Sequence, residues 1–502
     1  MANYHITIHG ADREVMADLV RAHGVRVYGQ TLIEEDTGYR VSGLADEETI
    51  TRLQGAGYRV EAHEDVDEAA QDSLRQVGQG NRFLDQGTDG VAEKDGSLLS
   101  PGAGSGVLSV SQRPGMTYLN VEEVETAIAL AAGPPNASFT ELIALPNQTW
   151  EGRTCHAIRI HHGTPARSGV YLLGGIHARE WGSPDILVNF VQLLTDAYRD
   201  GTEITQGGAS VSAAQVRAIV ETLDVVVFPQ ANPDGRHYSM TIDPMWRKNR
   251  RPADAGDPGC PSGGGNGPGV DLNRNYDFLW DFPTTFSPSA PVATSADPCS
   301  ETYYGPGAVS EPETNNVVWL LDRYPSVGYF IDIHSFGEDI LFNWGDDDDQ
   351  VTDPAMTFSD PNYDGKRGIP DSTPGGDPNK YREYIPPEDR HALITLGTIM
   401  RDAIGAAHGQ GYTLKQSVGL YPTSGTSDDY AYSRSFLDSS KDTVLGYTIE
   451  WGPQRSSIPK SFHPDYPDMV PIIEEITAGL LAFCLAATRR SLNAAPADAR
   501  TN

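Results

Sequence analysis

GVYLLGGIHAREWGSPDILVNFVQLLTDAYRDG, residues 169–201, joins a predicted strand to a predicted helix. The first part is an apolar run closed by glycines, which is typical of a buried strand. The second part opens with Ser183 and Pro184, residue types suited to a helix N-terminus, and stops at Gly201. Its apolar residues recur every three or four positions along one face; they are Ile186, Leu187, Phe190, Val191 and Leu194. A strand–helix unit of this kind predicts an α/β fold.

The same alternation continues through residues 116–490. Three more apolar runs read as buried strands that end in polar or glycine-bearing residues: LDVVVFPQANPDG (223–235), VGYFIDIHS (327–335) and VLGYTIEWG (444–452). Helical patterns lie between them. We therefore expect one α/β domain with a mixed central sheet flanked by helices.

A smaller unit precedes this domain. Residues 1–65 follow the order β-α-β-β-α-β, which predicts a ferredoxin-like α+β domain. Residues 66–115 turn to Gly, Ser, Gln and Asp and are expected to form a flexible linker, with the basic residues Arg75, Arg82 and Lys94 along it. Residues 491–502 are expected to be a tail.

Charge excludes some partners. The 502 residues carry 37 Lys plus Arg against 69 Asp plus Glu, a net charge of −32. Such a surface repels phosphate backbones and anionic lipid, so we expect no nucleic acid partner. No apolar run approaches the roughly 18–20 residues of a membrane span, and no signal peptide is visible, so we expect no membrane association.

Polar residues cluster where the predicted strands end. His177 and Glu180 follow one strand at a spacing of three, and His334 ends another. Because ligand sites in open α/β sheets lie at the carboxyl ends of the strands, these side chains are expected to meet. Two imidazoles and one carboxylate are the ligand set of a catalytic zinc site with an open position for water. His177 alone could equally be an ordinary histidine, and the residues do not distinguish zinc from a similar divalent ion; zinc is the default.

Further motifs follow in a fixed order. They are Arg247 in MWRKNR; Asp271, Asn273 and Arg274 in GVDLNRNYD; the CSETYYGP run; Tyr421 and Asp428 in VGLYPTSGTSDDY; and Glu450 in GYTIEWG. Together with HARE and IHS, this set resembles the pancreatic-type zinc carboxypeptidases, the M14 peptidase family, over about residues 116–490.

The resemblance implies a role for each matching residue. His177, Glu180 and His334 would bind one Zn²⁺ per chain, and Asp271 would orient His177 through its other ring nitrogen. Glu450 would be the general base and Arg247 would stabilise the oxyanion.

Substrate recognition is implied in the same way. Arg274 would grip the terminal carboxylate of a peptide or protein with its fork of N–H groups, helped by Asn273 and Tyr421. Arg179 would contact the substrate further upstream. Asp428 would form the floor of the pocket for the departing side chain, which favours Lys or Arg, with the adjacent Asp429 as the rival candidate.

Two cysteines bear on where the protein is located. The resemblance implies a disulfide between Cys260 and Cys299, and such a bridge argues for a secreted or extracytoplasmic protein. Family members of this kind often carry a ferredoxin-like pro-segment, so residues 1–65 are interpreted as a pro-segment removed by an activating protease, or as an attached accessory domain. The acidic run from Asp346 to Asp349 could bind calcium, although such runs are usually solvated.

Two other functions remain open from the sequence. The chain could be a zinc amidase acting on another amide, such as a cell-wall peptide or an acylated amino acid. It could also be a non-catalytic binding module. The presence of the full ligand set and of Glu450 argues against the second alternative, and the Arg274, Tyr421 and pocket apparatus against the first.

Overall fold

The computed structural model describes residues 3–12, 15, 16, 19, 23, 25–84, 117–163, 168–253, 260, 267–371, 381–409 and 411–493. Most of the expected linker and the expected tail beyond residue 493 lie outside the described residues.

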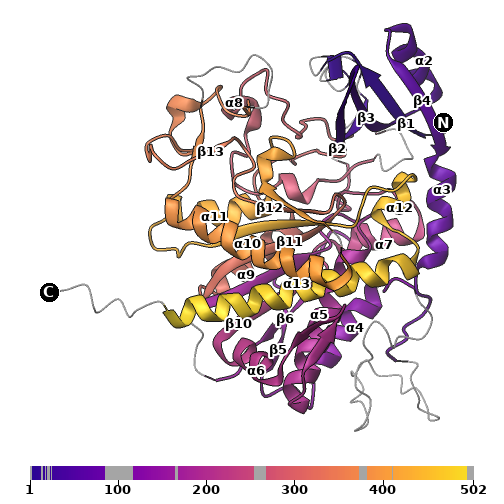
Figure 1. Cartoon of the computed structure of the whole chain (residues 1–502). Coiled ribbons are helices and arrows are strands. Elements are labelled where there is room, and N and C mark those ends of the chain that lie inside the picture. The colour runs from indigo at the N-terminus through magenta and orange to yellow at the C-terminus, as the bar shows by residue number, and fades with distance from the viewer. Residues whose placement is uncertain are drawn as a thin grey trace.

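An eight-stranded mixed sheet forms the centre of the main domain (Figure 1). Its order is β15-β12-β16-β11-β7-β10-β6-β5. The four middle strands, β16, β11, β7 and β10, are mutually parallel, whereas β12, β6 and β5 pair in antiparallel fashion. The strands are β5 (Thr140–Ala144), β6 (His156–Ile160), β7 (Ser168–Gly174), β10 (Leu223–Phe228), β11 (Val327–Ser335), β12 (Asp339–Phe342), β15 (Thr413–Gln416) and β16 (Leu445–Trp451).

Helices cover both faces of this sheet. One face packs against α4 (Val121–Ala132), α5 (Gly182–Asp200), α6 (Ala213–Thr222), α10 (Pro387–His408) and α13 (Tyr466–Asn493). The other face packs against α9 (Pro312–Arg323) and α11 (Ser427–Leu437). The shorter elements are β8 (Ile204–Gln206), β9 (Ala209–Val211), α7 (Pro233–Thr241), η3 (Leu272–Arg274), α8 (Phe282–Thr285), β13 (Asp349–Gln350), η4 (Pro361–Tyr363), β14 (Glu383–Tyr384), η5 (Ser417–Gly419) and α12 (Ile458–Phe462).

The long C-terminal helix belongs to the core. Within the described residues, the segment Ile458–Arg490, which includes most of α13, is apolar and long enough to cross a membrane, but 67% of its most apolar window is buried inside the protein. Met469, Ile473 and Leu480 have no or almost no exposed surface. Packing against α5 and α10 therefore accounts for its apolar composition.

The N-terminal residues form a separate four-stranded antiparallel sheet of order β2-β3-β1-β4. Its elements are β1 (Tyr4–Gly10), β2 (Arg26–Glu35), β3 (Gly38–Ala45), α2 (Glu47–Gly55) and β4 (Arg59–Asp65), with helical residues Val15, Met16 and Leu19 between β1 and β2. Ile6, Ile8 and Leu53 are fully buried between the sheet and the helices. The predicted fold class, a mixed α/β domain preceded by a small α+β domain, is confirmed.

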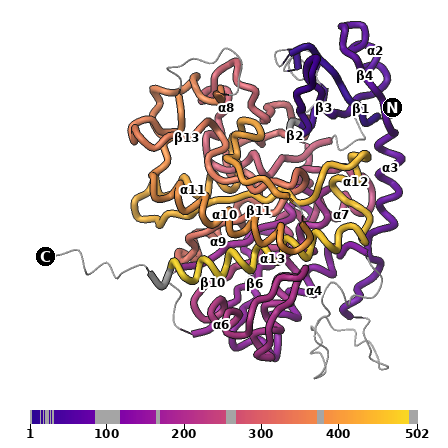
Figure 2. Tube along the Cα trace, in the orientation of Figure 1, coloured from indigo at the N-terminus to yellow at the C-terminus, as the bar shows by residue number. Residues whose placement is uncertain are grey.

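The small domain docks on the large one through the face of its sheet opposite the helices. Figure 2 shows it beside α12, near the end of the chain. Tyr28 packs against Phe336 and Phe462 of the large domain, with ring centroids 6.1 and 5.9 Å away. Polar contacts join this apolar cluster, since Gln454 donates to Ser42 (3.1 Å) and the Ile458 N–H donates to Glu64 (3.1 Å).

The expected linker does not begin at residue 66. Residues 66–73 form the helix α3 (Val66–Ser73), followed by η1 (Leu74–Gln76), because Val66, Ala70 and Ser73 recur at helical spacing and are buried. Beyond it, Arg82 pairs with buried Glu123 of the large domain, with Nε 2.7 Å from Oε1. The segment up to residue 84 is therefore bound to the large domain.

The acidic run that we expected to be solvated is half buried. Asp346 and Asp347 have no exposed surface. The loop folds around them, so that Asp347 accepts a hydrogen bond from the Gly368 N–H (2.8 Å), and Asp349 pairs with Arg390 (2.6 Å). Burial and the nearby Glu383 raise the pKa of Asp346 well above its usual range. Among the described residues, the run forms no group of three metal-ligating side chains.

The free energy of unfolding is predicted to depend on pH through His5 of the small domain. Burial and the neighbouring His63 lower the pKa of His5 to about 4, although the Ser456 backbone opposes this shift. Unfolded chains hold this proton below about 6.5, so the unfolded state binds more protons between about pH 6.5 and 4. The free energy of unfolding should therefore fall as the pH falls through this window. Urea unfolding at several pH values should show a shallower fall in His5→Gln, and an unchanged slope would contradict the assignment.

Candidate metal centre and substrate site

Two parallel strands, β7 and β11, bring the candidate metal ligands together at their carboxyl ends. His177 and Glu180 lie in the turn between β7 and α5, and His334 is the next-to-last residue of β11. The neighbouring strand β16 carries Glu450, which is the register partner of His334. Register partners in adjacent strands project to the same face, so Glu450 lies beside the ligand group.

The three side chains converge through specific atoms. Nδ1 of His177 is 2.9 Å from Nδ1 of His334, and both lie near the Glu180 carboxylate, at 2.8 and 3.1 Å. One donor atom from each residue lies within 4.8 Å of the others, and all three residues are buried.

The other nitrogen of each ring, Nε2, faces a second carboxylate. His177 Nε2 is 3.2 Å from Asp271 Oδ1, and His334 Nε2 is 2.8 Å from Asp332 Oδ2. Both nitrogens of each ring thus face a carboxylate, since each Nδ1 also lies near Glu180. With a cation at the point that the two Nδ1 atoms share, Asp271 and Asp332 would hold the ring protons on Nε2 and leave each Nδ1 lone pair for the cation. Two lone pairs and one carboxylate facing a common point match the donor set of zinc with three protein ligands.

The electrostatics of the group suit a cation. Burial favours the neutral acid of Glu180, but His177 and His334 outweigh it and hold its pKa below the usual range. Burial raises the pKa of Glu450 to about 8; Glu180 and Asp339 act in the same direction, and His334 and Arg247 oppose them. A cation at the centre would lower the Glu450 pKa again.

Arg247 is held next to the centre by the carboxylate that orients His177. Its Nε and Nη2 donate to Asp271 Oδ2 at 3.0 and 2.9 Å. Burial disfavours both charges, but Arg247 and His177 keep the pKa of Asp271 well below its ordinary value. Burial opposes the charge on Arg247, but Asp271, then Glu180 and then Tyr421 raise its pKa above the ordinary value, so Tyr421 also lies near Arg247.

The loop around η3 supplies the other two expected binding residues. Asn273 accepts a hydrogen bond from the Ser427 N–H (2.8 Å), which turns its amide NH₂ toward His334, 3.5 Å away. Arg274 is anchored by donation to the carbonyls of Ala293 and Asn273, both at 2.6 Å. These bonds fix the loop against α11.

Asp428 and Asp429 have different surroundings. Asp429 accepts hydrogen bonds from Asn343, the Gly345 N–H and Thr426 and thereby ties three segments together. Asp428 faces Thr448 Oγ1 (3.2 Å), which lies on the same face of β16 as Glu450. Burial raises the pKa of Asp428. Its position next to the Glu450 face favours Asp428 over Asp429 as the residue that a substrate side chain would meet.

Arg179 is already paired in this structure. It donates to Glu301 (2.8 Å), and its guanidinium lies over the Phe462 ring at 4.2 Å. Phe462 belongs to the cluster that holds the small domain, so Arg179 lies beneath the docked domain.

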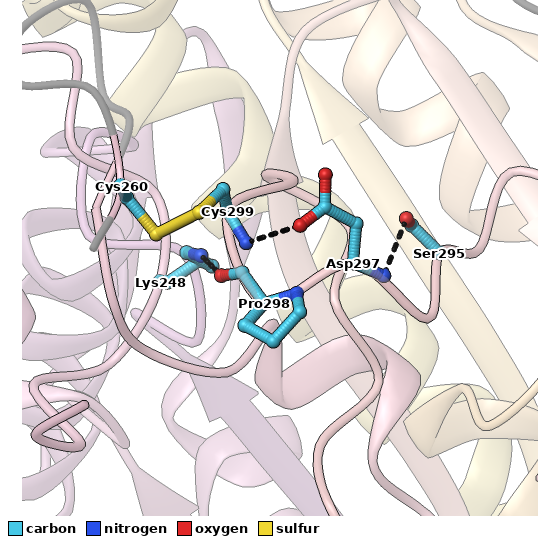
Figure 3. Close-up of a disulfide and its surroundings, with 6 residues drawn as sticks. All are labelled: Lys248, Cys260, Ser295, Asp297, Pro298 and Cys299. Carbon is cyan, nitrogen blue, oxygen red and sulfur yellow. Dashed lines mark hydrogen bonds between the residues drawn. A yellow bond between two sulfur atoms is a disulfide. The ribbon is translucent and has the colours of Figure 1, made fainter. Parts of the chain in front are cut away.

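Cys260 and Cys299 are joined in a disulfide (Figure 3). The Cys299 loop is shaped by local hydrogen bonds, in which the Cys299 N–H donates to Asp297 and the Asp297 N–H donates to Ser295. Lys248 Nζ donates to the Pro298 carbonyl (2.7 Å), which connects this loop to the segment that carries Arg247.

Sequence reasoning missed three residues of the site. Glu301 pairs with Arg179, while Asp332 and Ser427 form a contact that reaches His334. One signal for Asp332 was available. An acid two residues before His334 in an apolar strand must share its face of the sheet.

Comparison with known proteins identifies the class. The zinc carboxypeptidase family matches residues 129–478, and the chain belongs to this family. Zinc as the cofactor is thereby confirmed at the level of the family. The chain is 36% identical over 197 residues to zinc carboxypeptidase A 1 of Anopheles gambiae, across 39% of this chain and 37% of the relative. It is 27% identical over 338 residues to carboxypeptidase B of Astacus astacus, across 66% of this chain and 86% of the relative.

The fold is shared with solved structures of the same kind. Carboxypeptidase A from Helicoverpa armigera superposes with a TM-score of 0.65 at 20% identity, covering 97% of this chain and 98% of that chain. Some fungal relatives are named inactive metallocarboxypeptidases. Family membership therefore defines the fold and the cofactor, while activity and substrate are matters of proposal.

Proposed function

We propose that the protein is a metallocarboxypeptidase that hydrolyses the C-terminal peptide bond of peptides or proteins. The observation that carries the proposal is the joint position of the metal centre and Glu450. His334 and Glu450 are register partners on adjacent strands, and Arg247 is fixed beside them by Asp271. A cation site, a proton acceptor and an oxyanion donor then surround one reacting carbonyl.

Glu450 takes the role of general base. Zinc held by His177, Glu180 and His334 would supply a Lewis acid and would make a water molecule easier to deprotonate. The Glu450 carboxylate accepts that proton and returns it to the leaving amine. Its half-buried position near the end of β16, as the register partner of His334, keeps its carboxylate next to the metal ligands for both halves of this transfer.

Arg247 and Arg274 bind different groups of the substrate. Arg247 donates to the carbonyl oxygen as negative charge develops there. Arg274 and the Asn273 amide bind the free carboxylate of the chain end, and Tyr421 closes over it. Recognition of a free carboxylate restricts cleavage to the last residue, which makes the activity that of an exopeptidase. Arg179 contacts upstream residues after the small domain has left.

Asp428 gives the specificity. Asp428 is a buried carboxylate that accepts hydrogen bonds from Ser417 and from Thr448, which lies two residues before Glu450 in β16. Such a carboxylate favours a substrate side chain that brings a positive charge. We infer that C-terminal Lys and Arg are preferred. The relatives named carboxypeptidase B agree in name with this inference at 27% identity.

The alternatives are weaker on specific grounds. A non-catalytic module has no need of Glu450 and Arg247 in reacting positions. An amidase for another substrate has no need of Arg274, Asn273 and Asp428 together.

We further propose that residues up to 84 act as an inhibitory pro-segment and that the protein functions outside the cytoplasm. The docked domain covers Phe336, two residues beyond His334, and Phe462 over Arg179. The Cys260–Cys299 disulfide supports an oxidising compartment.

Substrate choice should follow the charge at residue 428. In a panel of blocked dipeptides ending in Arg, Lys, Phe, Leu and Glu, the enzyme freed of its small domain should release Arg and Lys best. Asp428→Ala should lose about 2–5 kcal/mol of transition-state binding for these two, roughly 30-fold to several thousand-fold in kcat/KM.

Two variants serve as controls. Asp429→Asn should lower stability without exchanging the preference, since Asp429 bonds only to neighbouring segments. Glu450→Gln should lower release of every residue by about 10²–10⁴-fold with zinc retained. A preference for Phe or Leu in the unaltered enzyme would overturn the role of Asp428, and release unaffected by Glu450→Gln would overturn the mechanism.

Activation should require that the small domain leave the large one. A cut between residues 85 and 116 alone should not activate the protein. Arg82 is held by Glu123, but the Arg75 side chain is 82% exposed. A protease site engineered within 85–116 should leave the fragments associated and activity low. A second site at Arg75 should release the domain and raise kcat/KM toward Arg-terminated dipeptides. Size-exclusion chromatography distinguishes associated fragments from the released enzyme, and peptidase activity is assayed on each fraction. Equal activity in the intact chain and the released enzyme would contradict the pro-segment proposal.

A further inference from the structure

Asp332 lies against the metal centre from within the sheet. It precedes His334 by two residues in β11, so both side chains project from the same face. Asp332 has no exposed surface, and its Oδ2 is 2.8 Å from His334 Nε2.

This contact would decide which nitrogen of His334 binds the metal. Nδ1 faces Glu180 and His177, and Nε2 faces Asp332. With a cation among the three ligands, Asp332 would accept the proton of Nε2 in a hydrogen bond and leave the Nδ1 lone pair for the cation. Asp271 does the same for His177. Each of the two histidines therefore has its own carboxylate, and the pair presents matched lone pairs.

Asp332 is itself held in place. The Ser427 hydroxyl donates to Asp332 Oδ2 at 2.6 Å, and the Ser427 N–H donates to Asn273. A chain of contacts thus runs from the loop that carries Arg274 through Ser427 and Asp332 to His334. The ring of His334 is fixed relative to the residues that bind the substrate carboxylate.

The two orienting carboxylates differ in charge balance. Asp271 also pairs with Arg247, which offsets its negative charge. Among the described residues, the ion-pair partner of Asp332 is His334, and its buried Oδ1 accepts no hydrogen bond. A buried carboxylate without an Arg or Lys partner is costly unless other positive charge lies near. A cation bound by His334 supplies that charge.

We propose that Asp332 is a positioning residue of the zinc site, which sets the tautomer of His334, fixes its ring and raises its basicity toward the metal. The proposal rests on His177, Glu180 and His334 being the ligands, but not on the reaction or substrate proposed above. Carboxylates that accept from a metal-bound histidine commonly change metal affinity about 10–100-fold when removed.

Zinc affinity measured without substrate tests the proposal. The full-length protein is stripped of metal and titrated with zinc against a fluorescent chelator at pH 7. Asp332→Ala, which removes both charge and acceptor, should weaken zinc binding about 10–100-fold. Asp332→Asn keeps an acceptor and should lose less, and Ser427→Ala should lose less again.

A matched control separates this effect from general damage. Asp224 is also a buried strand carboxylate, but it pairs with Arg159. Asp224→Asn should lower the free energy of unfolding of the metal-free protein and leave zinc affinity unchanged. The Asp332 variants should also shift the visible absorption of the cobalt-substituted protein, because the ligand field of His334 changes.

The outcomes are distinguishable. Zinc affinity and cobalt spectra equal to those of the unaltered protein in both Asp332→Asn and Ser427→Ala would overturn the proposal, even if Asp332→Ala failed to fold. Weakened zinc binding in the Asp332 variants, with peptidase activity absent even from the unaltered, zinc-loaded enzyme freed of its small domain, would support Asp332 and count against the proposed reaction instead.

Discussion

Convergence of two imidazole Nδ1 atoms and one carboxylate on a single point is the constraint on which the rest of the site depends. In water these groups would not stay at separations of 2.8, 2.9 and 3.1 Å without a cation. The sheet holds them there, because β7 and β11 are parallel neighbours whose carboxyl ends lie at the same edge. Orienting carboxylates then prevent the rings from turning.

The other residues of the site are held next to the metal ligands, either by strand register or by the carboxylates that orient the histidines. Glu450 is fixed by strand register, which depends on backbone hydrogen bonds and not on the flexibility of a loop. Arg247 and Asn273 are fixed through the two orienting arms, Asp271 and Ser427–Asp332. Preorganisation of this kind lets donors and acceptors act without rearrangement during the reaction.

The sequence predicted the parts whose chemistry is local. Buried strands, the helix after residue 182 and the polar residues at strand ends all have patterns that neighbours in the chain determine. The meeting of His177, Glu180 and His334 was expected from their places at strand ends, and their role as ligands from the resemblance to the zinc carboxypeptidases. The sequence could not tell which of Asp428 and Asp429 faces the substrate pocket. Adjacent side chains in a helix point in different directions, and only the tertiary contacts show where each one points.

Long-range packing explains the remaining differences. Residues 66–73 are helical because Val66 and Ala70 find an apolar surface on the large domain, which composition does not reveal. Asp346 and Asp347 are buried because the chain folds back over them near Gly368. Asp332 was visible in the sequence, but its partner Ser427 lies 95 residues away, so the contact required the fold.

The geometry of the metal centre is the central claim, and a crystal structure of the zinc-loaded protein with diffraction measured at the zinc absorption edge tests it most directly. The account predicts one strong anomalous peak, bonded to Nδ1 of His177, Nδ1 of His334 and the Glu180 carboxylate, with Asp271 and Asp332 still on the Nε2 atoms. A peak bonded through Nε2, a peak elsewhere, or none at this position in zinc-saturated crystals would contradict it.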